Sequence, residues 1–373
     1  MKINHTIIVG AGLSGAVIAN RIKAAGGNPL IFEKRSHPGG NIYDYKDTGG
    51  LIIQKYGAHI FHTNYNDVWE YLSSFTKWTP YEHVVLSKIE GHLINIPFNL
   101  NSLSKLFAAQ KADTYKKLLL ETFKHNALIS VMDLCQCPGE LGELGQYVFD
   151  TFYLQYSKKQ WGQDYHLINK NILARVPIKI NWDDRYFTDK YQALPELGYT
   201  HMIKKMVEGC AIEYRTDATK RVKLENGKIY IDNYLYDDKL YWTASLDQLF
   251  NYKYGRLPYR SLKFKQTKIN KEFYQPVSVV NFPNDHRYTR IIECKHLYNH
   301  KVPYTRIIKE YPMPCEENMV QYYPINNEVN QILYKKYLAE LRNYPNIVLL
   351  GRLADYQYYN MDDAVKKALT IQI

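Results

Sequence analysis

The sequence predicts an α/β fold with a helical insert and an antiparallel sheet, and three observations carry this prediction. The β-branched run from Thr6 to Val9 is followed at once by glycines and then by the apolar spacing of a helix. Apolar and polar residues alternate in β fashion after Ile172 and again from Tyr259 to Arg306. The segment from Ile347 to Leu350 returns to the buried-strand pattern of the opening, and Gly351 ends it.

The length and composition limit the number of domains and the possible binding partners only broadly. With 373 residues, the chain exceeds the average of about 150 residues per domain, so we expect two or three domains. It has no run of about 18 apolar residues that a bilayer span needs. The five scattered cysteines lack the paired spacing of zinc sites, which predicts no metal and a reducing cytoplasm. The net charge of +11 fits nucleic acid, a membrane surface or a phosphorylated small molecule, although the lysines form separated doublets rather than dense blocks.

The first strand and helix enclose a glycine motif. Gly10, Gly12 and Gly15 spell G-x-G-x-x-G, whose glycines permit a tight turn, close approach to a pyrophosphate and close helix–strand packing. Glu33 closes the second strand, from Pro29, at 18 residues after Gly15, where a carboxylate can accept ribose hydroxyls. This spacing favours a dinucleotide site, and the alternative is a glycine-rich turn in an ordinary βαβ unit.

The string EKRSHPGGN, from Glu33 to Asn41, favours FAD over NAD. A second glycine pair soon after the acidic residue resembles flavoproteins of the glutathione-reductase type, so we expect an FAD-binding Rossmann-like domain. Near the C-terminus, Asn360 can cap a final helix with Asp362 and Asp363 in its first turn. The positive end of that helix could then face the flavin pyrimidine, although an ordinary capped surface helix remains the alternative.

These patterns divide the chain into three expected domains. The FAD-binding domain is discontinuous, and it is expected to comprise residues 1–82, 199–248 and 320–373. A helical domain is expected at 102–165, and an antiparallel sheet domain at 83–101, 166–198 and 249–319.

Several longer strings, spread over the chain, resemble one family. They are KYGAHIFHTN (55–64), YSKKQWG (156–162), RYFTDKYQ (185–192), YRSLKF (259–264), RYTRIIE (287–293), QYYPIN (321–326) and GRLADYQYYNMD (351–362). In this order they look like bacterial UDP-galactopyranose mutase. The resemblance implies an isomerase that interconverts UDP-galactopyranose and UDP-galactofuranose without net oxidation. It implies reduced FAD whose N5 attacks the anomeric carbon, and a cytoplasmic homodimer with no nucleic-acid partner and no membrane insertion.

The resemblance also implies a set of substrate contacts. Arg175 and Arg290 match the two arginines that hold the diphosphate, and planar guanidinium groups suit phosphate oxygens. Taken alone, each arginine could instead be a solvated residue or a member of a surface ion pair. The other implied substrate contacts, mostly aromatic residues that could equally be core, are His83, Phe152, Tyr156, Ser157, Trp161, Tyr186, Asn281, Tyr323 and Tyr358.

The implied cofactor contacts include His59, which the resemblance places beside the flavin ring and which we group with the two arginines as catalytic. A histidine in an apolar strand is more often a hydrogen-bonded core residue. The full set is Gly10, Gly12, Ser14, Gly15, Glu33, Lys34, Arg35, Gly40, Asn41, His59, Ile60, Arg260, Arg352, Tyr359, Asn360, Met361 and Ala364.

Some residues depart from the family pattern. His83 stands where some relatives have asparagine, and Asn360 where many have aspartate. These changes leave the sugar open between galactose and its N-acetyl analogue. Two other functions also stay open: a redox flavoenzyme of the amine-oxidase type, and a non-catalytic FAD protein that binds nucleic acid. Turnover by the oxidised protein would indicate the first, and steeply salt-dependent RNA binding the second.

Overall fold

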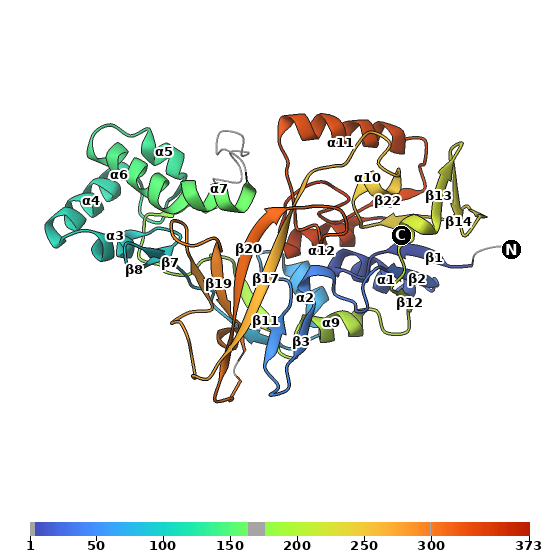
Figure 1. The fold of residues 1–373 in the computed structure, drawn as a ribbon, viewed down its shortest axis with the longest axis horizontal. Coiled ribbons are helices and arrows are strands. Elements are labelled where there is room, and N and C mark those ends of the chain that lie inside the picture. The colour runs from blue at the N-terminus through green and yellow to red at the C-terminus, as the bar shows by residue number, and fades with distance from the viewer. Residues whose placement is uncertain (1–3, 163–175, 299) are drawn as a thin grey trace.

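The computed structural model describes residues 4–162, 176–298 and 300–373. In these residues a parallel five-stranded sheet has the order β12-β2-β1-β16-β22 (Figure 1). Its strands are β1 (Thr6–Val9), β2 (Pro29–Glu33), β12 (Ala211–Tyr214), β16 (Leu240–Trp242) and β22 (Ile347–Leu349). The predicted strand, glycine turn, helix and second strand are confirmed, and β22 adds the C-terminal strand beside β16.

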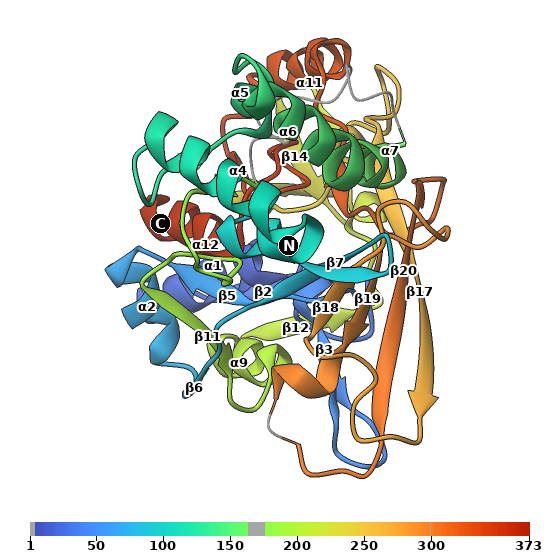
Figure 2. The same cartoon turned by 90° about the vertical axis from the view of Figure 1, so that its left-hand side faces the viewer.

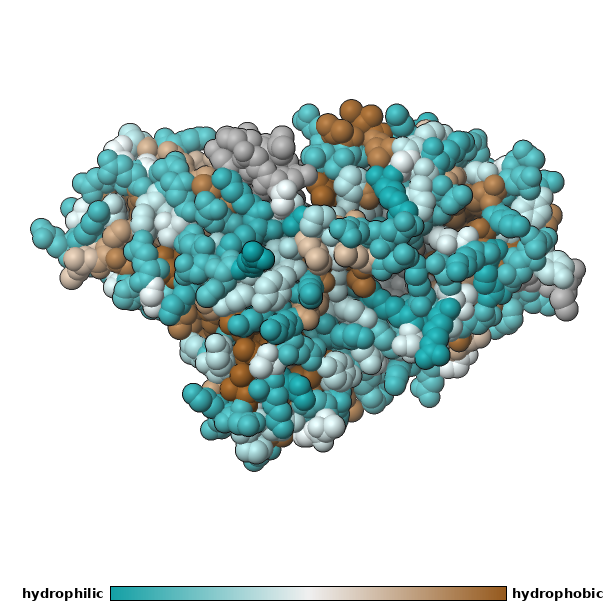
Figure 3. Space-filling model, viewed as in Figure 1, coloured by the Kyte–Doolittle hydropathy of each residue, from teal (hydrophilic) through white to brown (hydrophobic). Residues whose placement is uncertain are grey.

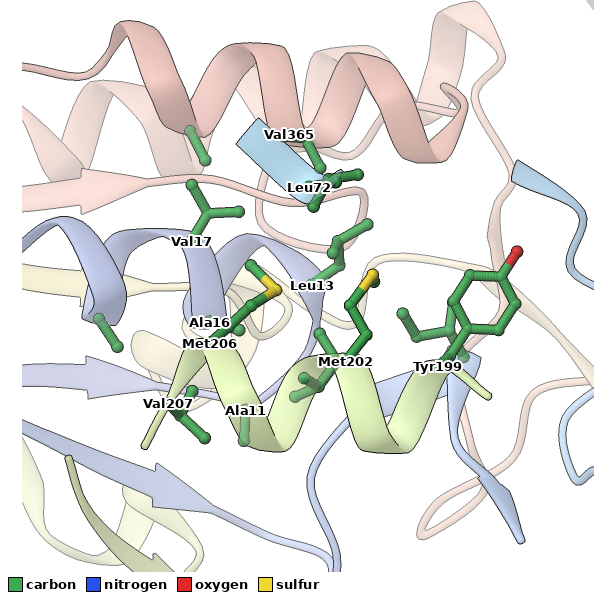
Figure 4. Packing of buried hydrophobic residues seen from close by; sticks show 14 of the residues in the cluster. Ala11, Leu13, Ala16, Val17, Leu72, Tyr199, Met202, Met206, Val207 and Val365 are labelled. Atoms are coloured by element: carbon green, nitrogen blue, oxygen red, sulfur yellow. The ribbon is translucent and has the colours of Figure 1, made fainter. Parts of the chain in front are cut away.

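One face of this sheet is covered by helices. They are α1 (Leu13–Ala24), α9 (Tyr199–Met206) and α12 (Met361–Thr370), with α2 (Asn66–Ser73) beside them. Figure 4 shows α1 between the other two, where Val17 faces Val365 of α12 and Ala16 lies near Met206 of α9. Because α1 is buried on both sides, its glycine-rich N-terminus is held firmly against the sheet.

The opposite face is covered by an antiparallel meander and two helices. These are β13 (Val222–Glu225), β14 (Lys228–Ile231), β15 (Tyr234–Tyr236), α10 (Leu246–Leu249) and α11 (Glu328–Leu341), with the short turn η4 (Ala218–Lys220). Asn226 and Gly227 form the turn between β13 and β14, and both residues have positive φ.

A second sheet of seven strands has the order β21-β17-β20-β19-β18-β7-β8. Its strands are β7 (Val85–Ile89), β8 (His92–Ile96), β17 (Tyr259–Ile269), β18 (Val279–Asn281), β19 (Arg290–Glu293), β20 (Thr305–Pro314) and β21 (Tyr323–Pro324), with η5 (Cys294–Leu297) before β20. Neighbouring strands are antiparallel except for β18 and β7. The long ribbon of β17 and β20 stands out in Figures 1 and 2.

The helical insert packs over one end of the second sheet (Figure 2). It contains α3 (Leu100–Leu106), α4 (Ala109–Thr122), α5 (Val131–Cys135), α6 (Glu140–Val148), the π-helical η2 (Phe149–Leu154) and α7 (Gln155–Trp161). Pro138 and Gly139, which disfavour a helix, separate α5 from α6. These helices approach closely because Gly145 has no side chain, and a Cβ there would lie 2.5 Å from the Cys135 nitrogen.

Some strand pairings differ from the expected domain boundaries. In a three-stranded sheet, β11 (Tyr191–Pro195) pairs with β5 (Phe61–Thr63) and β6 (Trp78–Pro80), although we expected 191–195 in the antiparallel domain. Likewise β21 pairs with β17 rather than joining the parallel sheet. Alternation along a strand does not identify its partner, which explains both differences. The division into three domains remains a proposal.

Short pairs complete the structure: β3 (Asp44–Lys46) with β4 (Ile52–Gln54), and β9 (Leu128–Ile129) with β10 (Ile178–Lys179), besides η1 (Gly40–Ile42). The β pattern predicted after Ile172 yields β10 and β11 in the described residues. The visible surface is mostly hydrophilic, apart from brown patches such as that over α11, where Val329 and Ile332 are exposed (Figure 3).

Within the described residues no helix is long and apolar enough to cross a membrane, and no group of histidine, cysteine, aspartate and glutamate side chains could hold a metal ion.

Candidate active site

Two large cavities lie side by side in the described structure. The first, of about 590 Å³, is lined by the glycine turn, Glu33 and the start of α12. The second, of about 570 Å³, lies between η2, α7 and the seven-stranded sheet. Six residues line both cavities: Asn41, His59, Tyr322, Arg352, Asn360 and Met361. Molecules bound in the two cavities could therefore touch at this shared wall.

Backbone atoms form one end of the first cavity. Gly10 has a φ of +97°, and a Cβ on Gly15 would lie 2.0 Å from the Gly10 carbonyl oxygen, so the turn can form only with glycine at both positions. Gly12 packs directly against Gly40, where a Cβ on Gly40 would lie 3.0 Å from the Gly12 Cα, and it begins α1 without a side-chain cap or an acidic residue in the first turn. The free N–H groups and the positive end of α1 therefore suit a pyrophosphate.

Glu33 and Arg35 supply charge to the same cavity. The buried Glu33 carboxylate accepts hydrogen bonds from the Ala11 nitrogen at 2.7 Å and the Arg35 nitrogen at 2.8 Å. Its remaining lone pairs can accept ribose hydroxyls. The Arg35 Nη2 donates to Asn41 at 2.7 Å, and its buried Nη1 has no hydrogen-bond partner. A buried unpaired donor beside a glycine cradle fits a phosphate oxygen.

The N-terminus of α12 lies at the shared wall. Asn360 is its N-cap as predicted, and its backbone nitrogen donates to the Asp363 carboxylate at 3.1 Å. Met361 and Ala364, in the first turn, line the first cavity. The positive end of this helix therefore points toward the junction of the cavities.

His59 is neutral and has a defined tautomer. Burial lowers its pKa to about 4, and the nearby positive charge of Arg352 acts in the same direction. Its Nδ1 lies 2.9 Å from the Gly57 carbonyl oxygen, which can only accept, so Nδ1 carries the proton. His59 therefore offers Nε2 as a hydrogen-bond acceptor.

Strand register brings the polar residues of the second cavity together. Glu310 of β20 pairs with Arg290 of β19, Arg290 with Asn281 of β18, and Asn281 with Ser87 of β7. Paired residues point to the same side of a sheet, so these side chains form one polar row. The row two residues away on the same face is apolar and comprises Ile308, Ile292, Val279 and Val85.

Arg290 is held by a buried carboxylate that the sequence analysis did not single out. Its Nε and Nη2 each lie 2.8 Å from Glu310 Oε2, while the other Glu310 oxygen has no partner. Burial alone would lower the pKa of Arg290, but Glu310 and the nearby hydroxyls of Tyr156 and Tyr323 raise it well above its usual value. Arg290 is thus a fixed, permanently charged group that lines the cavity with Nη1 uncommitted to Glu310.

Aromatic rings form another wall of the second cavity. The ring of Trp161 lies 5.9 Å from that of Tyr323 and 6.4 Å from that of Tyr358, centre to centre. Burial raises the pKa of Tyr156, so its hydroxyl stays protonated and can donate. Such rings pack against a sugar or base while their hydroxyls bond its oxygens.

Most predicted site residues line the cavities. The second cavity collects His83, Phe152, Tyr156, Ser157, Trp161, Tyr186, Asn281, Arg290, Tyr323 and Tyr358. The first collects Gly10, Gly12, Ser14, Gly15, Glu33, Lys34, Arg35, Gly40, Asn41, His59, Arg352, Asn360, Met361 and Ala364. Ile60 lines the second cavity instead of the first, and Arg175 lies outside the described residues. The lining also includes Tyr153, Gln160 and Phe187, which the sequence analysis did not single out.

Arg260 and Tyr359 line neither cavity, and their assignment as cofactor contacts stays a prediction. The Arg260 Nε donates to the Gln160 carbonyl at 3.0 Å, so its positive charge caps the C-terminus of α7. Its role is to hold the helix end that carries Trp161. The Tyr359 hydroxyl donates to Asp355 at 2.7 Å.

Comparison with known proteins agrees with this geometry. The family model for UDP-galactopyranose mutase matches residues 151–358, and one for an NAD(P)-binding Rossmann-like domain matches residues 8–75. The UDP-galactopyranose mutase of Mycoplasma genitalium is 36% identical over 96% of this chain and 91% of its own length. The chain belongs to the UDP-galactopyranose mutase family. It is therefore an isomerase of that family, with a Rossmann-like nucleotide-binding domain.

Two further comparisons bear on substrate and fold. The dTDP-fucopyranose mutase of Escherichia coli is 29% identical over 98% of this chain and 97% of its own length. A crystal structure of a reduced UDP-galactopyranose mutase covers 98% of this chain and 94% of its own, with a TM-score of 0.75 and 16% identity. The latter confirms the fold class alone.

Proposed function

We propose that this protein interconverts UDP-galactopyranose and UDP-galactofuranose, with FAD in the first cavity and the nucleotide sugar in the second. The wall shared by the two cavities is the observation that carries this proposal. It would allow the redox-active ring of a cofactor to reach a sugar held beside Arg290. The family relationship supports the choice of a UDP-sugar.

The residues present fit FAD. The unpartnered donor of Arg35 and the open N-terminus of α1 suit its pyrophosphate, and Glu33 suits its ribose. The N-terminus of α12 would stabilise negative charge on the pyrimidine part of the reduced ring. Reduced FAD bound there would supply an N5 nucleophile for the anomeric carbon, with no net consumption of electrons.

The protein's own groups would then hold the substrate and its leaving group. A departing UDP gains negative charge, so a fixed guanidinium stabilises the transition state more than the ground state. We assign this role to Arg290, oriented by Glu310, and to Arg175 as the second diphosphate arginine. The hydroxyls of Tyr156, Tyr323 and Tyr358 would orient the substrate.

We also place the reaction in the cytoplasm of the cell and expect a homodimer. All five cysteines are free, which suits a reducing compartment. The dimer rests on family resemblance, and light scattering of the purified protein tests it.

The test compares reduced and oxidised protein in anaerobic buffer. Dithionite-reduced protein is mixed with UDP-galactofuranose, and the products are separated by chromatography. We expect conversion to UDP-galactopyranose by the reduced protein only, with no loss of reducing equivalents per turnover. Turnover by oxidised protein with net substrate oxidation would instead indicate a redox flavoenzyme. A parallel assay with dTDP-fucopyranose shows which nucleotide sugar is preferred.

A further inference from the structure

A buried chain of polar groups ends at the second cavity. The Tyr81 hydroxyl donates to Ser278 Oγ at 2.7 Å, and Ser278 Oγ lies 3.4 Å from Nδ1 of His83. Ser278 and His83 are 1% and 5% exposed. Of the three, His83 lines the cavity, while Tyr81 and Ser278 lie behind it.

The protons of this chain can be assigned one by one. A phenol is a stronger acid than an alcohol, so Tyr81 donates and Ser278 Oγ accepts. The buried Ser278 hydroxyl has no other hydrogen-bond acceptor among the described residues, so we assign its proton to His83 Nδ1. Burial lowers the pKa of His83 to about 3, and the positive charge of Arg290 acts in the same direction, so the ring is neutral. A neutral imidazole has one N–H, which here falls on Nε2.

His83 and His59 therefore have opposite polarity in one cavity. His59 donates from Nδ1 to a carbonyl and offers Nε2 as an acceptor, whereas His83 accepts at Nδ1 and offers Nε2–H. Both rings line the second cavity and both are neutral at physiological pH. A ligand in this cavity that reaches both rings would meet one acceptor and one donor.

We propose that Tyr81 and Ser278 are positioning residues that lock His83 as an Nε2–H donor, and that this donor selects ligands with an oxygen acceptor opposite it. The tautomer follows from the protein alone. Its use in selecting a nucleotide sugar rests on the function proposed above.

Nitrogen NMR tests the tautomer directly. The full chain is labelled with 15N-histidine, and His83 is assigned by the signals that disappear in His83→Gln. We expect protonation at Nε2 in the parent protein, and a mixture of both tautomers in Ser278→Ala. Ser278→Thr keeps the hydroxyl and should restore the Nε2–H form. A parent ring protonated at Nδ1, or an unchanged tautomer in Ser278→Ala, would overturn the proposal.

Binding of UDP-galactopyranose tests the selection. Loss of one oriented hydrogen bond should weaken binding by about fivefold in Ser278→Ala, with recovery to within about twofold in Ser278→Thr. Ser102→Ala is the matched control, because it removes a fully buried hydroxyl that lines neither cavity and makes no contact with His83. Equal affinity of Ser278→Ala and the parent would overturn the selective role. A correct tautomer in a protein that binds no UDP-galactopyranose would instead refute the proposed function.

Discussion

The two cavities are built in different ways. At its glycine-turn end the first cavity takes its shape from main chain in two short segments, residues 10–15 and 33–41, beside the Glu33 carboxylate and Arg35. The second is built from side chains that η2, α7, β18, β19 and residues 322–361 bring together across long stretches of sequence. Adding a side chain to the glycine turn should therefore prevent flavin binding in the first cavity. Removing a charge should lower the turnover that depends on the second.

The largest effect is expected from filling the first cavity's turn. In Gly15→Val the new Cβ would meet the Gly10 carbonyl oxygen, so the turn and the N-terminus of α1 must move. We expect purified Gly15→Val to carry less than about a tenth of the parent's flavin, measured by visible absorbance. Gly26→Asn is the control, because a Cβ at Gly26 meets nothing within 4 Å and asparagine tolerates positive φ. Full flavin content in Gly15→Val would contradict this picture of the turn.

Removal of charge from the second cavity should leave flavin bound. Arg290→Ala should lower turnover by about a hundredfold or more, as loss of transition-state charge stabilisation does, at normal flavin content. Arg306→Ala is a matched control, since Arg306 pairs with Asp47 and is 26% exposed, against 22% for Arg290. Steady-state kinetics of both variants decide the matter. Similar rates in the two variants would remove Arg290 from the site.

A smaller effect on turnover is expected from removing the charge of Glu310, which orients Arg290. Glu310→Gln leaves Arg290 without its buried counter-charge, which should lower the free energy of unfolding by about 2 kcal/mol. Turnover should fall about tenfold because the guanidinium is less well oriented. Saturating UDP should stabilise Glu310→Gln more than the parent, since the diphosphate replaces the lost carboxylate. Urea unfolding with and without UDP measures this, and equal stabilisation of both proteins would argue against a diphosphate at Arg290.

The most gradual effect, small for each pH unit, is expected from protonation of His83. The pKa of folded His83, about 3, lies below that of an unfolded histidine, so the unfolded chain binds a proton that the folded ring refuses. The free energy of unfolding should therefore fall as pH drops from about 6.5 toward 3, by about 1 kcal/mol per pH unit from this ring. Below that range both states are protonated and the loss stops. His83→Gln should flatten the urea-unfolding slope between pH 6.5 and 4.5, and an unchanged slope would mean that His83 is not buried as a neutral ring.

The difference in how the two cavities are built also explains which site residues the sequence could predict. The glycine turn, Glu33 and the N-cap Asn360 depend on neighbouring residues, and local spacing identified all three. The link between Glu310 and Arg290 depends on the register of β19 and β20, which alternation along each strand does not specify. A signal was present, since Glu310 interrupts the apolar positions of its strand, but it did not name a partner.

Family resemblance located most second-cavity residues but did not reveal what each side chain does. Arg260 matched a cofactor contact, whereas its guanidinium caps α7, since the end of that helix happens to lie over β17. Tyr81 and Ser278 belong to no sequence motif. Their positioning role is indicated only by the hydrogen bonds that connect them to His83. Such roles follow from tertiary contacts rather than from spacing.

The central claim is that a cofactor in the first cavity meets a sugar whose diphosphate lies at Arg290. A crystal structure of the full chain soaked with UDP-galactopyranose tests it most directly. We predict FAD along the glycine turn, the diphosphate within about 3 Å of the Arg290 guanidinium, and the sugar at the shared wall beside His59. Nucleotide bound away from Arg290, or a first cavity that takes up no flavin, would contradict the account.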